Sequence, residues 1–258
     1  MINLTTAELT AWVGQFLWPF IRISTLFMFM PIIGAASVPA RVRLSMGLSI
    51  AFLIMNIIPA VPAVEPFSIA ALGIMLHELA IGLTGALLLN LFMATFTTAG
   101  QMMSMQMGLG MAVMVDPVNG VNIPILAQFF QLLAFLMFLS LNGHLIVIEL
   151  LINSFYLMPI STDLGFSDSL DQLIKLGAWV FSSALLISLP AITAMMVVNF
   201  TFGVMNRAAP QLNVFSLGFP MSMLCGLLAL LLSVANISGI FLQLTEETMT
   251  MLKVMWRQ

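Results

Sequence analysis

The sequence has very few charged residues, and this scarcity defines the class of protein. Only 7% of the residues are charged and 61% are hydrophobic, whereas about a quarter of the residues in soluble domains are charged. The apolar runs are also far longer than the alternating segments of about ten residues that build membrane barrels. The sequence therefore predicts an all-α integral membrane protein.

Cysteine and catalytic motifs are scarce as well. The one cysteine, Cys225, lies inside an apolar run, which excludes an internal disulfide and predicts an inert, buried thiol. The sequence shows no metal-ligand cluster, phosphate-binding glycine loop or nucleophile elbow, and neither histidine belongs to an HExxH motif. The net charge of -3 argues against nucleic acid as a partner. We therefore expect no enzyme, no metal site and no cofactor.

Long apolar segments make up most of the chain. There are six of them, at residues 12–36, 44–64, 67–99, 123–158, 173–205 and 212–244. A membrane span needs about 20 residues, so the longer segments must tilt, break or pack inside a protein assembly. Plausible breaks are Pro31, Asn142-Gly143, Pro190 and Pro220. We expect about six long, kinked helical segments that form helical hairpins.

The basic residues of the connections and the termini bear on the orientation of the chain in the membrane. They divide equally, three on each side of the membrane, but Arg41 and Arg43 lie in the short connection after the first segment. That connection usually stays cytoplasmic, which favours external termini. The orientation after Asn142-Gly143 inverts if this pair is a hairpin turn rather than a kink. The first residues lack the basic region of a signal peptide, so we expect no cleaved leader.

Ionisable residues also lie inside the apolar segments, where charges face protein or water rather than lipid. They are Arg22, His77, Glu78, His144 and Glu149. Two interpretations stay open at this point. The histidines and glutamates could form the proton relay of a transporter, or these groups could pair with one another or with a neighbouring subunit.

Two spacing patterns place polar or small residues on helix faces. Glu78, Gly82 and Gly85 fall at positions i, i+4 and i+7, so one face of a helix carries a carboxylate and two glycines and suits close helix packing. A second pattern depends on one continuous helix over residues 128–153. That helix would align a polar stripe facing partner helices or a wet path, made of Gln128, Gln131, Asn142, Glu149 and Asn153.

Residues 100–124 interrupt the apolar segments with an unusual composition. Methionines and glycines precede a single charged residue and a proline: Met102, Met103, Met105, Met107, Gly108, Gly110, Met111, Met114, Asp116 and Pro117. Methionine side chains are unbranched and adaptable, and glycine frees the backbone, so this stretch can re-pack around whatever touches it. The stretch is therefore either gap-filling core or a deformable gasket or plug.

Five motifs follow one another along the chain. After Arg22 and Pro31 they are VPARVRLSMGLSIA, HELAIGLTGALL, AGQMMSMQMGLGMAVMVDP, NGHLIVIELLINSFYLMP and NRAAPQLNVFSLGFP. Together, in this order and at these distances, they resemble the FliR family of flagellar export-gate proteins and its counterparts in type III injectisomes. The resemblance spans the whole chain.

The resemblance implies an inner-membrane subunit of the export gate at the bacterial flagellar basal body. Such a subunit assembles with FliP and FliQ, adjoins FlhB and FlhA, and forms the entrance pore for unfolded flagellar proteins. It implies a FliP-like part over residues 1–172, with the plug in residues 100–124, and a FliQ-like helical hairpin over residues 173–258. The cytoplasmic turn of that hairpin would contain Arg207, Pro210, Gln211 and Asn213. The alternatives are a proton-coupled small-molecule transporter and a purely structural membrane subunit.

Overall fold

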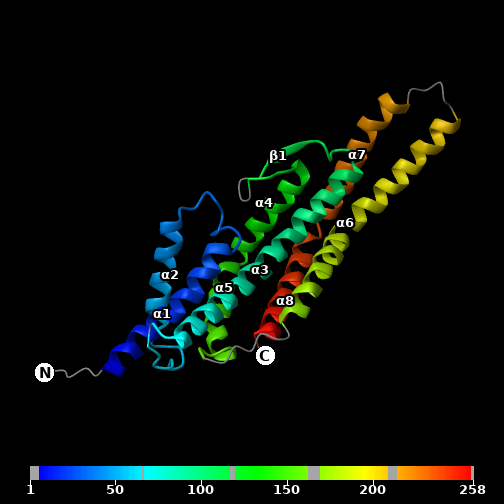
Figure 1. The fold of residues 1–258 in the computed structure, drawn as a ribbon. Helices are drawn as coiled ribbons and strands as arrows, with labels where there is room; N and C mark the ends of the chain where they lie inside the picture. The colour runs from blue at the N-terminus through cyan, green and yellow to red at the C-terminus, as the bar shows by residue number, and fades with distance from the viewer. Residues whose placement is uncertain (1–5, 66, 117–119, 162–168, 209–213, 257–258) are drawn as a thin grey trace. The chain divides into compact units, whose positions relative to one another are not determined.

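A computed structural model describes residues 6–65, 67–116, 120–161, 169–208 and 214–256 of the chain. These residues are almost entirely helical, which confirms the predicted all-α class (Figure 1). The helices are α1 (Thr6–Phe29), α2 (Ala40–Ile54), α3 (Ile69–Gln106), α4 (Ile125–Ser140), α5 (Gly143–Leu157), α6 (Ser169–Ala208), α7 (Val214–Val234) and α8 (Ile237–Met255). An α-helix satisfies its own backbone hydrogen bonds, which is what an apolar chain in a bilayer requires.

Two of the six predicted segments are each divided into two helices. The fourth is interrupted between α4 and α5, where Asn142 has a φ of 56° and precedes the first residue of α5. Asparagine is one of the few residues that tolerate this left-handed conformation. The last segment is interrupted between α7 and α8, at Ala235 and Asn236.

The predicted polar stripe over residues 128–153 is wrong, because it requires one continuous helix. Gln128 and Gln131 are buried on α4, which ends at Ser140, whereas Glu149 is exposed on α5. Two further expectations fail at Pro190 and Pro220, where helix breaks were predicted. Helix α6 continues through Pro190, where the Thr193 hydroxyl donates to the carbonyl of Leu189 at 2.9 Å, and α7 continues through Pro220.

Two helices of the described chain are long and apolar enough to cross a membrane, namely α3 and residues 175–208 of α6. The number rises to four if α4 with α5, and α7 with α8, each count as one broken span. These assignments rest on length and composition. They agree with an integral membrane protein.

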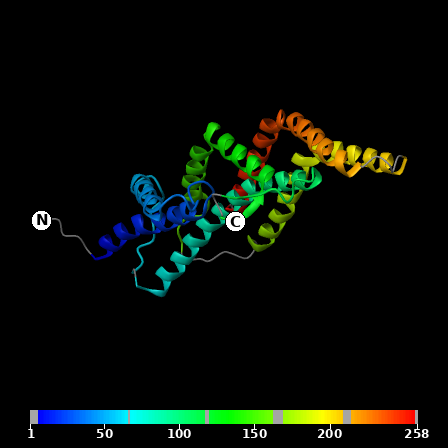
Figure 2. The same cartoon turned by 90° about the horizontal axis from the view of Figure 1, so that it is seen from above.

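The chain divides into two compact units. The first contains Met1–Asn90, Leu141–Lys175 and Thr248–Gln258, and in it α1 and α2 lie side by side (Figure 2). These two helices approach closely, since a Cβ added at Gly47 would lie 2.6 Å from Ser24 Oγ. The turn between them is held by Arg43, whose Nη2 donates to the carbonyls of Ala35 at 2.6 Å and Val38 at 2.7 Å.

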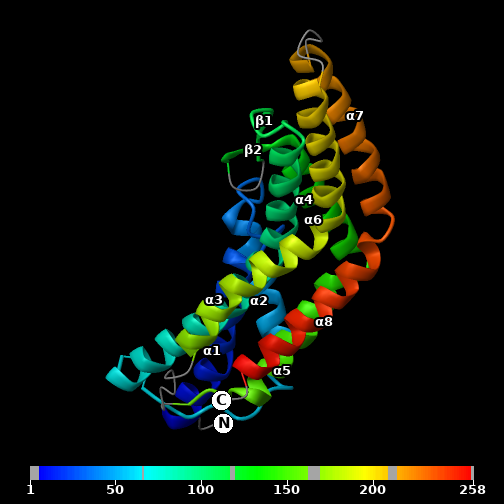
Figure 3. The same cartoon turned by 90° about the vertical axis from the view of Figure 1, so that its right-hand side faces the viewer.

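The second unit contains Leu91–Ser140 and Leu176–Glu247. Within it α6 and α7 run side by side, as Figures 1 and 3 show. The short strands β1 (Val113–Val115) and β2 (Asn122–Pro124) pair antiparallel, with Met114 opposite Ile123. The predicted division into FliP-like and FliQ-like parts concerns a likeness to other subunits rather than compactness, and it stays a prediction.

Candidate functional site

The Met-rich segment, residues 100–124, starts as helix and ends as a hairpin. Helix α3 extends to Gln106, beyond the predicted end at residue 99, so the first part of the segment is helical. Gly108 then turns the chain with a φ of 75°, a conformation that glycine adopts at no steric cost. The strands β1 and β2 follow (Figure 3). Pro117 lies outside the described residues.

Some methionines of the segment are core residues. Met103 and Met107 are each only 1% exposed, and Met107 forms a buried cluster with Leu126 and Met195 of α4 and α6. The Met102 sulfur accepts a hydrogen bond from the Ser188 hydroxyl at 3.6 Å. For these side chains the gap-filling interpretation describes the packing within the second unit.

Other methionines of the segment point outward. Met105 is 69% exposed, Met111 93% and Met114 48%. Gly110 leaves space for the Met105 sulfur, which a Cβ at position 110 would contact. The segment therefore presents flexible thioether side chains on one side while other methionines fix it on the other.

Asp116 is buried at the end of the hairpin where the chain turns, directly after β1. Its side chain is 1% exposed and accepts a hydrogen bond from Gln131 Nε2 on α4 at 3.3 Å. Its backbone N–H donates to the carbonyl of Val121 at 2.8 Å, and its carbonyl accepts from the N–H of Gly120 at 2.8 Å. The one charge of the segment thus faces the protein, and among its described residues Asn122 is the one polar side chain in the exposed class; the other exposed side chains are apolar.

A buried ion pair joins α1 and α3 in the first unit. Arg22 and Glu78 are both 0% exposed, and two guanidinium nitrogens of Arg22 donate to the two carboxylate oxygens, at 2.6 Å and 2.9 Å. Arg22 also donates to Ser154 Oγ and to the Met158 carbonyl, each at 3.0 Å. The guanidinium carbon lies 4.2 Å from the centroid of the Phe155 ring. We call these five residues the Arg22 network.

The Arg22 network satisfies most of what a buried arginine needs. Bidentate pairing with a carboxylate is the strongest arrangement open to a guanidinium, and its remaining hydrogen bonds reach α5 and the residue that follows it. A buried ion pair is tolerated where both partners are hydrogen-bonded, whereas removal of one partner leaves an unpaired charge. The network therefore ties α1, α3 and α5 together.

Small residues let α1 and α3 approach beside this network. A Cβ at Gly82 would lie 2.5 Å from the Arg22 carbonyl oxygen and 2.9 Å from Thr25 Cβ. A Cβ at Gly85 would lie 3.1 Å from atoms of both Leu26 and Trp256. Gly82 and Gly85 share a face of α3 with Glu78, so close packing and charge pairing occur on the same face.

The remaining intramembrane candidates are not gathered at one point. His77 Nδ1 lies 3.7 Å from Glu78 Oε1 and so borders the Arg22 network. His144 is half-buried in the first turn of α5, and Glu149 is exposed further along that helix. Glu78 is thus engaged with an arginine and Glu149 is on the surface.

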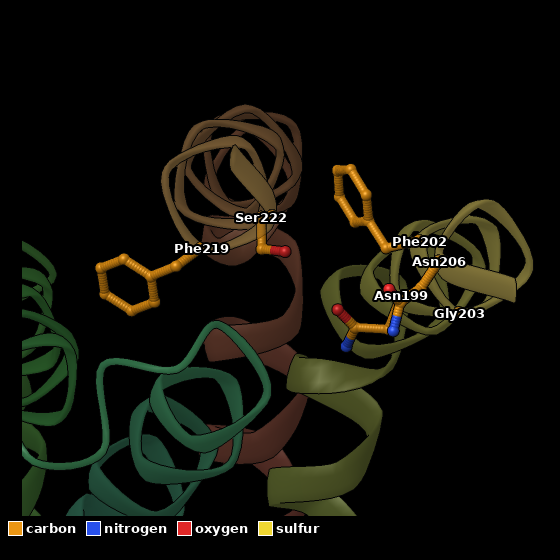
Figure 4. A pocket seen from close by; sticks show the side chains of 7 residues that line it. Asn199, Phe202, Gly203, Asn206, Phe219 and Ser222 are labelled. Carbon is orange, nitrogen blue, oxygen red and sulfur yellow. The ribbon is translucent and has the colours of Figure 1, made fainter. Parts of the chain in front are cut away.

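Of the residues predicted for the cytoplasmic turn, the structure describes Arg207. Arg207 is exposed in the last turn of α6, whereas Pro210, Gln211 and Asn213 lie outside the described residues. A pocket of about 260 Å³ opens between α6 and α7. Figure 4 shows Phe202 and two asparagines on α6 across from Ser222 on α7, while Phe219 points away from α6.

Several residues of these sites have no distinct signal in the sequence. Ser154, Phe155 and Gln131 contact residues far away along the chain, so periodicity alone gives no reason to select them. Gly226, in α7, has one available signal, because an isolated glycine in an apolar helix often marks a close approach. A Cβ at this position would meet the Met107 side chain at 2.6 Å.

The fold and these sites define a helical integral membrane protein, with a paired buried charge and a methionine-rich segment that is partly core and partly surface. No group of three or more potential metal ligands occurs in the described parts of the chain. Residues 13–248 match the bacterial export proteins, family 1, and the chain belongs to that family. The predicted resemblance to the FliR family is thereby confirmed.

FliR proteins of other bacteria are similar to this chain over most of its length. The flagellar biosynthetic protein FliR of Escherichia coli K12 is 36% identical over 229 residues, which cover 88% of this chain and 87% of the relative. The FliR protein of Pectobacterium carotovorum is 35% identical over 230 residues, covering 89% and 88%. The FliR protein of Bacillus subtilis 168 is 30% identical over 242 residues, covering 91% and 92%. The chain is a membrane component of the flagellar export apparatus, and its family is not a known class of enzymes.

Proposed function

We propose that this chain is an inner-membrane subunit of the flagellar type III secretion export gate. It forms, with FliP and FliQ, the entrance pore for unfolded flagellar proteins at the basal body, next to FlhB and FlhA. Its Met-rich segment seals that pore when no substrate is passing. Family membership supports the export role, and the geometry of the segment supports the seal.

The observation that carries the seal is the division of the methionines. Met105, Met111 and Met114 are exposed, whereas Met103 and Met107 are buried in the second unit. An unfolded substrate presents every kind of side chain, so a seal around it cannot depend on one hydrogen-bond geometry. Flexible thioether side chains adapt to varied surfaces, and buried methionines keep them in place. The hydrogen bond from Gln131 to Asp116 fixes the turn end of the β1–β2 hairpin.

Exposed apolar surface supports assembly with other membrane subunits. Large apolar side chains are exposed on α6 and α7, among them Phe181, Phe200 and Leu232. Exposed large apolar side chains on helices of a membrane protein face lipid or protein partners. Arg207, exposed at the end of α6, is where we place the approach of FlhB.

A proton-coupled transporter fits the same residues less well. A relay needs carboxylates that can exchange protons along a path, whereas both oxygens of Glu78 accept from Arg22 in a buried pair. Glu149 is exposed on α5. The Arg22 network instead favours a structural role for the intramembrane charges, and this role is compatible with the export gate.

The seal is tested by shortening the segment. Deletion of residues 109–111 removes exposed Met111 while sparing buried Met107. We expect the assembled gate to conduct small ions in the absence of substrate, measured as current across planar bilayers. A second variant replaces residues 109–111 with three serines, which keeps the length and removes the Met111 thioether. We expect this variant to conduct at rest as well, because the seal depends on the thioether. Unchanged current from the shortened, fully assembled gate would overturn the sealing function.

A further inference from the structure

Gly226 on α7 forms a notch that the Met107 side chain fills. A Cβ at position 226 would lie 2.6 Å from both Cγ and Cε of Met107 and 3.0 Å from its sulfur. Met107 is 1% exposed. Real Cβ atoms do not approach carbon atoms so closely, so this packing needs glycine at position 226.

The next residue of the Met-rich segment contacts the same helix. A Cβ at Gly108 would lie 3.3 Å from Cε2 of the Phe219 ring. Phe219 and Gly226 are seven residues apart, which places them on one face of α7, two turns from each other. Figure 4 shows that Phe219 points away from α6. Consecutive residues of the segment therefore pack along one face of α7.

The surroundings of the notch are apolar and come from several elements. Met107 clusters with Leu126 and Met195, and Cys225 and Leu230 of α7 pack around this cluster. Contacts of this kind depend on shape and buried area rather than on directed hydrogen bonds. Met107 can therefore leave the notch and return to it without breaking a polar network.

The other side of Phe219 has free space. This residue also lines the pocket of about 260 Å³ between α6 and α7, together with Gly203 and Ser222. A Cβ at Gly203 would meet no atom within 4 Å. The structure thus leaves room for α7 to move toward α6 at the level of Phe219, two turns from Gly226.

We propose that Gly226 positions the seal. Met107 in the Gly226 notch acts as a latch that holds the Met-rich segment closed, and movement of the α6–α7 hairpin releases it. Release frees exposed Met105 and Met111 to re-pack around a passing chain. The inference rests on the proposed function for the seal, but the latch itself is a packing relation that can be measured separately.

Cys225 reports on the latch, because it is the only cysteine in the chain and packs against the Met107 cluster. The sequence predicted a buried thiol, but Cys225 is partly exposed in the structure. We would measure the rate at which N-ethylmaleimide modifies Cys225 in the assembled gate in native membranes. Gly226→Val forces Met107 out of the notch, and we expect modification to be about tenfold faster. Gly239→Val is the matched control, since a Cβ there meets no atom within 4 Å.

Two further variants keep the test decisive if Gly226→Val impairs assembly. Met107→Ala removes the side chain without adding a clash and should also accelerate modification of Cys225. The double variant Met107→Gly with Gly226→Met moves the methionine side chain to α7 and the glycine to the Met-rich segment. It should return the rate of Cys225 modification toward that of the wild-type chain.

The outcomes separate the latch from the seal. Faster modification in the single variants, reversed in the double variant, supports the latch. If the single variants show this faster modification but conduct no ions in the absence of substrate, the latch is supported and the sealing function is not. Unchanged modification in both Gly226→Val and Met107→Ala, in gates shown to be assembled, overturns the latch.

Discussion

The Arg22 network and the Met-rich segment differ in how their buried side chains are held. In the network, a charged side chain is fixed by four hydrogen bonds to Glu78, Ser154 and Met158. In the segment, buried Met107 is held by apolar contacts with Leu126 and Met195. Directed bonds between buried charges allow one geometry, whereas thioether packing allows many. The comparison indicates a chain that is rigid where helices are tied together and deformable where a substrate would pass.

Removing Glu78 should have the largest effect. Glu78→Ala leaves the Arg22 charge buried and unpaired, which costs about 3–5 kcal/mol. We expect loss of the assembled gate, measured as the amount of complex recovered after detergent extraction. Glu149→Ala is the control, because Glu149 is exposed. Normal recovery with Glu78→Ala would show that the network does not tie the helices together.

The two classes of methionine should differ in their contribution to stability. Met107→Ala empties a buried site and should destabilise by about 2–5 kcal/mol, whereas Met111→Ala on the surface should change stability by less than about 0.5 kcal/mol. Both changes in stability can be measured by heating the purified gate and recording the midpoint temperature at which it loses its assembly. Equal shifts in the two variants would remove the division on which the seal depends.

Gly82→Ala tests the close packing of α1 and α3 beside the Arg22 network. The added Cβ would meet the backbone carbonyl of Arg22 at 2.5 Å, so α1 and α3 must separate, at a cost of about 1–3 kcal/mol. The same heating measurement should show a lower midpoint. Gly73→Ala on α3 adds its Cβ where no atom lies within 4 Å, and it should leave the midpoint unchanged or raise it. Equal midpoints for the two variants would contradict the close packing at Gly82.

Much of the rigid part can be predicted from the sequence. Charges within apolar segments must be paired or must face water, and this requirement selects Arg22 and Glu78. The spacing of Glu78, Gly82 and Gly85 places these three residues on one face of a helix. Ser154 and the Met158 carbonyl cannot be selected in this way. They meet Arg22 only through the packing of α5, more than a hundred residues further along the chain.

The deformable part is less predictable. Composition identifies the Met-rich segment, but the end of α3 and the turn at Gly108 decide which methionines are buried. Met107 and Met111 are one helical turn apart in the sequence, yet one is buried and the other is exposed, because the helix ends at Gln106. The break at Asn142 is similar, since a local left-handed residue overrides the helical period of residues 128–153.

The most direct test of the sealing function is site-specific photo-crosslinking from position 111 while a flagellar substrate is stalled in the gate. Met111 is 93% exposed, whereas Met107 is 1% exposed, so position 107 is the matched internal control. The sealing function predicts crosslinks from position 111 to the substrate that disappear when transit is blocked upstream, and crosslinks from position 107 within the gate. Crosslinks from position 111 only to gate subunits, in a complex shown to be translocating, would contradict it.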